Sequence, residues 1–252
     1  MPFRSALLAL LIGVHLPLHA APLRVGVEEM SPPKWQHYVA DRPTGYCADL
    51  LDALAGRNAA LRFSFAAQAV PQKRMEAELL DGSIDLVCGL TRTPRRTASF
   101  HYVEFPIYAM DYVLFARAAD PLSPQSWDAV RALGADGVIL LNYDSSAIGR
   151  LQHLGGLQLD ASGRTIEHNF RKLLSGRGRF FFYHRPGGFA EMQRLKLQHE
   201  LRIVEPALDT QAFFLLLGRH VPVDVRASLL ETLQALDASG ELRALQQRWA
   251  LP

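Results

Sequence analysis

Short apolar runs alternate with amphipathic stretches along the first half of the chain. The runs have the length and composition of strands, and they lie at residues 23–27, 61–65 and 84–87. Between them, apolar residues recur with helical spacing around Leu50 and Met75, and the second stretch ends at Gly82, a residue typical of helix ends. This β-α-β-α-β order predicts a mostly parallel sheet with helices on its faces.

The alternation of strands and helices continues through the second half. Further strands are expected at residues 112–117, 138–141, 180–183 and 212–217. A break at residues 121–124, which contain two prolines, separates a second α/β unit from the first. Asp144 or Ser145 is a predicted helix N-cap, and Pro186-Gly187-Gly188 is predicted to interrupt the chain before a short helix. Two amphipathic helices, separated by Ser239-Gly240, close the chain.

The first 20 residues have the pattern of a secretory signal peptide. Arg4 gives a positive start, residues 6–14 form an apolar run too short to span a bilayer, and Ala20 is a small residue before the predicted cleavage point. A membrane anchor is the alternative, and it is disfavoured because no stop-transfer pattern or second long apolar segment follows. We therefore expect a soluble chain that is cleaved near Ala20 and exported to the periplasm.

Length, charge and histidine spacing limit the function. About 230 residues remain after cleavage, enough for one large or two small domains. The chain has 27 basic and 25 acidic residues, and removing Arg4 leaves 26 against 25, which argues against a dedicated nucleic-acid binder. The histidines after residue 20 are never three or four positions apart, so the pattern indicates no metal site. We also expect no cofactor.

Cys47 and Cys88 are the two cysteines of the chain. A disulfide between them can persist in an exported protein. Two unpaired cysteines in the core are the alternative, and the sequence leaves both interpretations open.

Residues 88–96 are the strongest candidate for a binding segment. The strand predicted at residues 84–87 ends here, so Gly89 and Thr91 place backbone N–H groups and a hydroxyl at a sheet edge, where α/β folds bind ligands. Arg96 can hold a carboxylate with two parallel hydrogen bonds. An ordinary surface loop with solvated arginines is the alternative.

A second candidate lies after the strand predicted at residues 138–141. Ser145 and Ser146 stand at a predicted helix N-terminus, where free N–H groups attract anions. A plain helix cap, with no part in binding, is the alternative.

Five segments of the chain have the order and composition of one known family. They are LRVGV (23–27), GYCADLL (45–51), GSIDLVCG (82–89), Thr91 with TPRR (93–96), and ASGEL (238–242) with RW (248–249). Together with the signal peptide, they make the chain resemble the family 3 extracellular solute-binding proteins, the periplasmic receptors of amino-acid ABC transporters. The resemblance covers essentially all of the mature chain.

This resemblance implies an α/β fold, the two-lobe periplasmic-binding-protein fold of type II. Each lobe has a mostly parallel sheet with flanking helices, and two crossing strands, expected near residues 112–117 and 212–217, join the lobes. Lobe 1 is expected at residues 22–116 and 213–252, and lobe 2 at residues 117–212. A ligand is trapped between the lobes by hinge closure, and the protein is expected to be a monomer.

The resemblance also implies roles for single residues. Arg96 matches the arginine that clamps an α-carboxylate, and Thr91 and the Gly89 backbone match the neighbouring donors. Ser145 and Ser146 match the lobe 2 helix N-terminus that holds the other side of the carboxylate.

The chain departs from the family pattern at three places. His184 stands where an Asp pairs with the ammonium group of an amino acid, and a His suits an anionic group better. A solvent-facing His-Arg pair is the alternative, and Glu28 or Glu29 can replace the missing Asp if either reaches the ligand. Ser31 and Gln72 fall where the family often has aromatic residues, whose place Trp35, Tyr38 or Met30 can take.

Three functions follow from these expectations. The first is a solute-binding protein that captures a small carboxylate-bearing solute for an ABC permease, with no catalytic residue. The second is a sensory protein that reports ligand occupancy to a membrane partner. The third is an enzyme that resembles the exported cyclohexadienyl dehydratases, with His184, Glu28 or Glu29 as the candidate acid.

Overall fold

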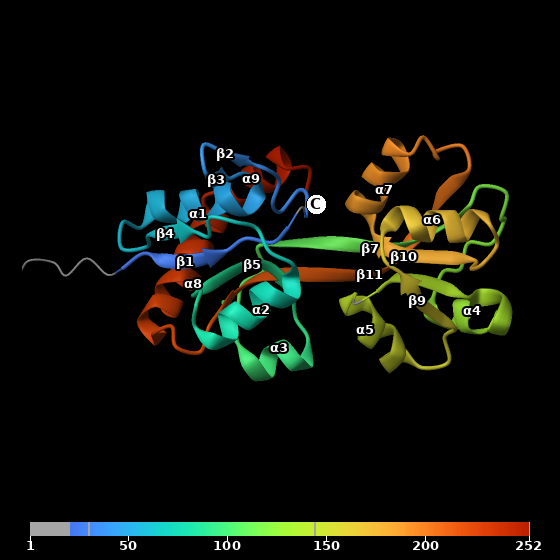
Figure 1. The fold of residues 1–252 in the computed structure, drawn as a ribbon, viewed down its shortest axis with the longest axis horizontal. Coiled ribbons are helices and arrows are strands. Elements are labelled where there is room, and N and C mark those ends of the chain that lie inside the picture. The colour runs from blue at the N-terminus through green and yellow to red at the C-terminus, as the bar shows by residue number, and fades with distance from the viewer. Residues whose placement is uncertain (1–20, 30, 144, 252) are drawn as a thin grey trace, which may run out of the picture.

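The computed structural model of the chain describes residues 21–29, 31–143 and 145–251. The predicted signal peptide, Met30 and Asp144 therefore lie outside the described residues. Figure 1 shows two lobes, and two long strands, β7 (Tyr108–Arg117) and β11 (Leu201–Leu217), run from one lobe into the other. The predicted fold class, a two-lobe α/β fold, is confirmed.

Lobe 1 has a sheet with strand order β4-β1-β5-β11, in which β1 pairs in parallel with both β4 and β5. Its strands are β1 (Leu23–Gly26), β2 (Tyr38–Val39), β3 (Arg42–Pro43), β4 (Phe63–Phe65), β5 (Leu86–Thr91) and β6 (His101–Tyr102). Its helices are α1 (Tyr46–Arg57), α2 (Gln72–Asp81), α3 (Pro94–Ser99), α8 (Val223–Ala238) and α9 (Glu241–Arg248). As predicted, α2 ends at Gly82, which has the left-handed conformation that favours glycine.

Lobe 2 continues the same sheet in the order β7-β10-β8-β9. Its strands are β8 (Ile139–Asn142), β9 (Leu159–Gly163) and β10 (Phe180–His184). Its helices are α4 (Trp127–Arg131), α5 (Ser146–Leu154), α6 (Ile166–Leu174) and α7 (Arg185–Arg194), with a short 3₁₀ turn at Gly134–Gly137. The core is aromatic: Phe170 meets Phe115 and Phe181, each with ring centroids 5.4 Å apart.

The lobes are joined by a short two-stranded segment, which we call the neck. Strand β5 pairs with β11 from Phe213 onward, and β10 pairs with β7 from Tyr112 onward. Between these points β7 and β11 pair only with each other, through Ala109–Ala212, Met110–Gln211 and Asp111–Thr210. The predicted lobe boundaries, at residues 116/117 and 212/213, stay a prediction. On β7 the neck comes before residue 116 in the chain.

Strand β5 extends further than predicted. The residues after 87, which were expected to form a loop, are the second half of the strand. Cys88 and Leu90 are buried, and β11 pairs with β5 as far as Thr91. The predicted edge residues Gly89 and Thr91 are therefore part of the strand.

Two other elements differ from the sequence-based expectation. Helix α7 begins at Arg185 and contains the expected break, because Pro186 lies in its first turn, where a missing N–H is tolerated. Strand β11 begins at Leu201 instead of residue 212, and polar residues in its first part hid this extension.

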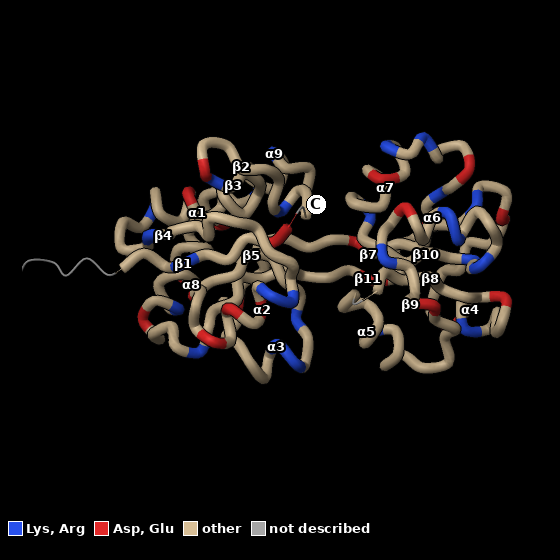
Figure 2. The backbone as a smooth tube through the Cα atoms, in the orientation of Figure 1, with Lys and Arg blue, Asp and Glu red and all other residues tan. Residues whose placement is uncertain are grey.

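A disulfide joins Cys47, at the start of α1, to Cys88 in β5, with Cα atoms 6.0 Å apart. Both residues are fully buried, so the disulfide ties the helix layer of lobe 1 to its sheet. In Figure 2, acidic and basic positions are interspersed over both lobes. No helix in the described part of the chain is long and apolar enough to cross a membrane.

Candidate functional site

Gly89 lies in β5 next to β11, in close contact with Lys34 and Tyr108. The pairing of β5 with β11 shifts register opposite this residue, and Gly89 has a positive φ of 80°. A Cβ here would lie 2.4 Å from Lys34 Cδ and 2.8 Å from Tyr108 Oη. Only glycine therefore allows both side chains to approach the strand so closely.

Lys34 and Glu28 form an ion pair beside Gly89. The Lys34 ammonium donates hydrogen bonds to the Glu28 carboxylate and, at 3.1 Å, to the Gly89 carbonyl. The two side chains are 9 % and 14 % exposed. Sequence reasoning predicted Glu28 and Gly89 but missed Lys34, because no spacing rule connects residues 55 positions apart.

Arg96 and Thr91 contact each other, as the predicted clamp requires. Arg96 Nη1 donates to the Thr91 carbonyl at 2.9 Å and to its hydroxyl at 3.1 Å. The remaining guanidinium contacts are with Glu76, whose Oε1 accepts from Nε at 3.2 Å and from Nη2 at 2.8 Å. Arg96 thus holds a carboxylate of its own chain.

Glu76 is also paired with Arg95, so one carboxylate serves two arginines. The side chains of Glu76 and Arg96 are each 5 % exposed, whereas Arg95 is exposed. The alternative interpretation of a solvated surface arginine is therefore wrong for Arg96. Glu76 was missed by sequence reasoning, although it lies between buried Met75 and Leu79 on α2, which is an unusual place for an unpaired acid.

In lobe 2, the two predicted anion-binding positions are helix caps. Ser145 Oγ accepts a hydrogen bond from the Ala147 N–H at 3.2 Å, and Ser146 is the first residue of α5. His184 caps α7, because its Nδ1 accepts from the Gly187 N–H at 3.1 Å. The side chains of Ser145 and His184 therefore each have a structural partner within lobe 2.

His184 is neutral at physiological pH. Burial, and then the positive charge of Lys34, lower its pKa from 6.5 to about 4. Since Nδ1 accepts a hydrogen bond, the neutral ring carries its proton on Nε2, for which no partner is found among the described residues. His184 is half-buried and caps α7, so it does not extend freely into solvent as the alternative of a solvent-facing His-Arg pair requires.

Three tyrosines lie in this region near the neck, Tyr108 and Tyr112 buried and Tyr183 partly buried. Burial is the main cause that raises the pKa of each: well above 10 for Tyr108, to about 12 for Tyr112, and also upward for Tyr183. The negative charge of Glu28 contributes to all three shifts. The hydroxyl of Tyr108 is buried without a hydrogen-bond partner among the described residues.

A further ion pair connects lobe 2 to the neck. Arg150 of α5 donates to Asp209 of β11 from Nη2 at 2.8 Å and from Nε at 3.0 Å. Its guanidinium lies 5.0 Å from the centre of the Tyr112 ring. Arg150 Nη1 is buried and has no partner among the described residues. Sequence reasoning missed this pair, which joins residues 59 positions apart.

The lobes also approach each other near Ser145. Lys73 of α2 in lobe 1 lies 5.9 Å from the centre of the Tyr143 ring in lobe 2. Of the aromatic candidates for the lid, Trp35 is fully buried and packs edge-on against Phe65, so it belongs to the core of lobe 1. Tyr38 donates its hydroxyl hydrogen to the Ala66 carbonyl.

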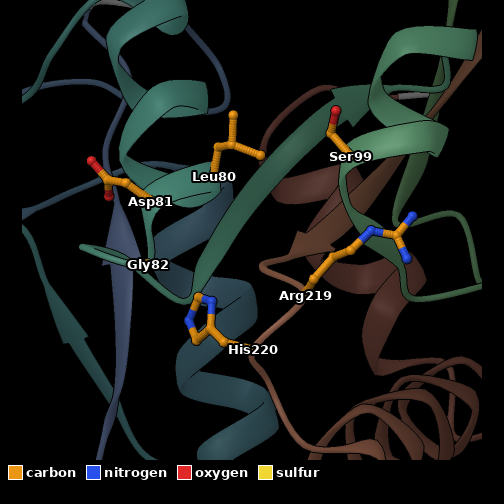
Figure 3. Close-up of a pocket in the computed structure, with 6 residues that line it drawn as sticks. All are labelled: Leu80, Asp81, Gly82, Ser99, Arg219 and His220. Atoms are coloured by element: carbon orange, nitrogen blue, oxygen red, sulfur yellow. The ribbon is translucent and has the colours of Figure 1, made fainter.

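An open pocket of about 550 Å³ lies in lobe 1 (Figure 3), lined by Leu80, Asp81, Gly82, Ser99, Arg219 and His220. Its polar groups are engaged elsewhere: His220 bonds Asp85 at 2.9 Å, and Arg219 donates to the Ala98 carbonyl at 2.9 Å. Figure 3 shows the Asp81 carboxylate pointing away from Arg219. Among the described residues, no group of three or more His, Cys, Asp or Glu could hold a metal ion.

Solved structures with the same fold span almost the whole chain. A histidine kinase sensor domain with similarity to periplasmic binding proteins is 19% identical, with TM-score 0.72, covering 92% of this chain and 96% of its own. A probable amino-acid ABC transporter extracellular-binding protein, ytmK from Bacillus subtilis, is 15% identical, with TM-score 0.73 and coverages of 91% and 97%.

The ancestral amino acid-binding protein AncCDT-1, a precursor of cyclohexadienyl dehydratase, is 16% identical, with TM-score 0.69 and coverages of 90% and 94%. No curated protein matches the chain. Residues 23–252 match the family model of the bacterial extracellular solute-binding proteins, family 3. The chain therefore belongs to the family 3 bacterial extracellular solute-binding proteins.

Proposed function

We propose that this protein captures a small carboxylate-bearing solute between its two lobes and delivers it to an ABC-type importer. The observation that supports this proposal is that polar side chains of both lobes gather beside the neck: Lys34 pairs with Glu28 next to Gly89 in lobe 1, and Arg150 of lobe 2 bonds Asp209 over the Tyr112 ring. The ligand-binding residues in this proposal are Arg96, Thr91, Gly89, Glu28, Ser145, Ser146 and His184.

Arg96 remains the proposed clamp even though it is paired with Glu76. Arg95, Arg96 and Glu76 together carry two positive charges and one negative charge, so the cluster still attracts an anion. A guanidinium has five N–H donors, of which Arg96 uses four on Glu76 and Thr91. A ligand carboxylate binds the fifth donor or takes the place of Glu76.

The first test is a stability screen of the chain from residue 21 onward, after unfolding and refolding to remove any co-purified ligand. We expect some amino or organic acid to raise the melting temperature, because a ligand that binds only the folded state stabilises it. If no carboxylate shifts the melting temperature while a sugar or a polyamine does, the proposal is wrong.

The second test removes the charge of the clamp without leaving a buried acid unpaired. The double variant Arg96→Gln with Glu76→Gln should lower the affinity for the identified carboxylate by about 30-fold or more, since a lost charge-assisted pair costs at least about 2 kcal/mol. The matched control is Arg74→Gln with Glu78→Gln, which removes an exposed ion pair from the same helix. Equal affinities in both double variants would exclude Arg96 as the clamp.

The importer and the sensor share one fold, as the ABC transporter binding protein and the kinase sensor domain show. The predicted cleaved leader supports the importer, because cleavage releases a chain that can shuttle between ligand and permease. Uptake of the radiolabelled solute by cells with and without the gene decides between them. Normal uptake with a lost transcriptional response to the solute would favour the sensor.

The dehydratase alternative has support from the fold of AncCDT-1 alone. His184, its best candidate acid, has a pKa of about 4 and is therefore not a protonated acid at neutral pH. Incubation of the purified protein with prephenate and with arogenate, followed by chromatography of the products, tests this alternative directly. Turnover that is lost in Glu28→Gln would establish it.

A further inference from the structure

We propose that the solute is a carboxylic acid without an α-ammonium group, such as a hydroxy, keto or dicarboxylic acid. This inference rests on the proposed function, because it assumes that a carboxylate binds between the lobes. Two features support it: the ion pairs that the acids of this region form, and the hydrogen-bond donors that have no partner among the described residues.

An ammonium group needs a carboxylate partner, and the acids whose charges act on the three tyrosines of this region are already paired with cations. The carboxylates whose charges act on Tyr108, Tyr112 and Tyr183 are Glu28, Asp209 and Glu191. Each is held by a cation of the same chain: Glu28 by Lys34, Asp209 by Arg150, and Glu191 by Arg194. Glu76 is likewise held by Arg95 and Arg96.

Taking one of these acids for a ligand ammonium would leave its cation without a partner. Lys34 is the clearest case, since its side chain is only 9 % exposed and its other hydrogen bond goes to the Gly89 carbonyl. A buried charge that loses its partner is strongly unfavourable. An α-amino acid would therefore place its ammonium at the expense of an existing ion pair, whereas a ligand without the ammonium needs none of these acids as a partner.

The polar atoms without partners are suited to a ligand that accepts hydrogen bonds. Arg150 Nη1 can only donate, and the buried Tyr108 hydroxyl, which stays protonated, can donate as well. His184 adds a neutral Nε2–H from lobe 2. These groups match the oxygens of a carboxylate, a ketone or a hydroxyl. Arg150 Nη1 and the His184 Nε2–H can only donate, so they offer no acceptor to the hydrogens of an ammonium group.

Matched acid pairs test the inference, since their members differ mainly in the α-ammonium group. The refolded chain would be titrated calorimetrically with succinate and aspartate, with 2-oxoglutarate and glutamate, and with lactate and alanine. In at least one pair we expect the acid to bind ten times more tightly than the amino acid. Tighter or equal binding of the amino acid in every pair that binds would overturn the inference and leave the proposed function standing. Binding of no member, together with no carboxylate found in the stability screen, would overturn both.

Two variants of His184 then test whether the absence of a negative charge at this position causes the preference for an acid without an α-ammonium group. Asp and Asn both accept hydrogen bonds well at a helix N-cap, so His184→Asp and His184→Asn each preserve the start of α7. Only the Asp variant adds a negative charge to lobe 2. We expect the affinity ratio of acid to amino acid to be at least tenfold lower in His184→Asp than in His184→Asn, because both variants lose the imidazole donor and only the Asp variant adds a negative charge. Equal ratios in the two variants would overturn the assignment to charge.

Discussion

The two lobes present different chemistry to the region between them. Lobe 1 offers the ion pairs of Glu28 with Lys34 and of Glu76 with Arg96, whereas lobe 2 offers the neutral caps Ser145 and His184 beside one cation, Arg150, which is paired with Asp209. Ion pairs are held in one geometry and act on a charged ligand over some distance. Neutral caps act only through direct hydrogen bonds. Under the proposed function, we expect an anion to be attracted first by the charged groups of lobe 1 and the caps of lobe 2 to add their hydrogen bonds when the lobes close.

The largest effect is expected when one member of the buried Glu76–Arg96 pair in lobe 1 is removed. Arg96→Leu should lower the free energy of unfolding by about 3–5 kcal/mol, because Glu76 stays buried with the exposed Arg95 as its remaining cation and Gln72 as a neutral donor. Denaturation by urea measures the change.

The control for this prediction is the double variant Arg96→Leu with Glu76→Leu. Replacing a buried pair by apolar residues is often close to neutral, so the double variant should recover most of the loss. A double variant as unstable as Arg96→Leu would show that packing of the arginine, and not its charge, matters.

The disulfide distinguishes the lobes in a second way. Replacing Cys47 and Cys88 by Ala should lower the free energy of unfolding by about 2–4 kcal/mol, since the bond closes a loop of considerable length in the unfolded chain. The bond joins α1 to β5, so hydrogen exchange should rise in these elements and stay unchanged in β8 and β10 of lobe 2. Equal increases in both lobes would mean that the lobes unfold as one unit.

The pH dependence of stability tests the neutral character of lobe 2. His184 has a pKa of about 4 in the folded chain and 6.5 as its ordinary value, so the unfolded chain binds more protons between these values. Stability should therefore fall as the pH drops from 6.5 toward 4, with a loss of about 2 kcal/mol at pH 5 relative to pH 8.

His184→Asn isolates this contribution, because it keeps the cap and cannot take up a proton in this range. The pKa of His101 is also lowered, by burial and by Arg226 and Arg219, and its contribution remains in both proteins. Urea denaturation at pH 8, 6 and 5 should give a shallower slope for the variant. Identical slopes would show that His184 carries no buried, neutral ring.

The smallest expected effect separates the two roles of Ser145. Ser145→Ala should lower the free energy of unfolding by about 1 kcal/mol, the usual value of an N-cap. Ser145→Asp preserves the cap and should leave the stability nearly unchanged. If Ser145→Asp also leaves ligand affinity unchanged, Ser145 is a cap alone and has no part in binding.

Much of the fold could be predicted from periodic patterns. Helical spacing around Leu50 and the stop at Gly82 gave α1 and the end of α2, because both are local features of the chain. The second half of β5 was missed because Gly89 and Thr91 resemble loop residues, although β11 pairs with them. The start of α7 was missed because proline and glycine usually interrupt helices, whereas the first turn tolerates them.

The site was less predictable than the fold, because its charged residues depend on distant partners. Arg96 and Thr91 are five positions apart and were predicted together. Glu76 and Lys34 were not, since a charged residue in a sequence indicates a solvated surface unless its partner is known. Their burial follows from contacts with Arg96 and Gly89, 20 and 55 positions away.

The neck has a mechanical consequence. Among the described residues, three residue pairs, from Ala109–Ala212 to Asp111–Thr210, form the part of the sheet in which β7 and β11 have no other strand beside them. A ribbon of two strands bends and twists easily, but it resists stretching because its backbone is extended and its strands are hydrogen-bonded to each other. The neck therefore acts as a short hinge. A rotation of a few degrees within these six residues moves the far edges of the lobes by several times the displacement at the hinge itself.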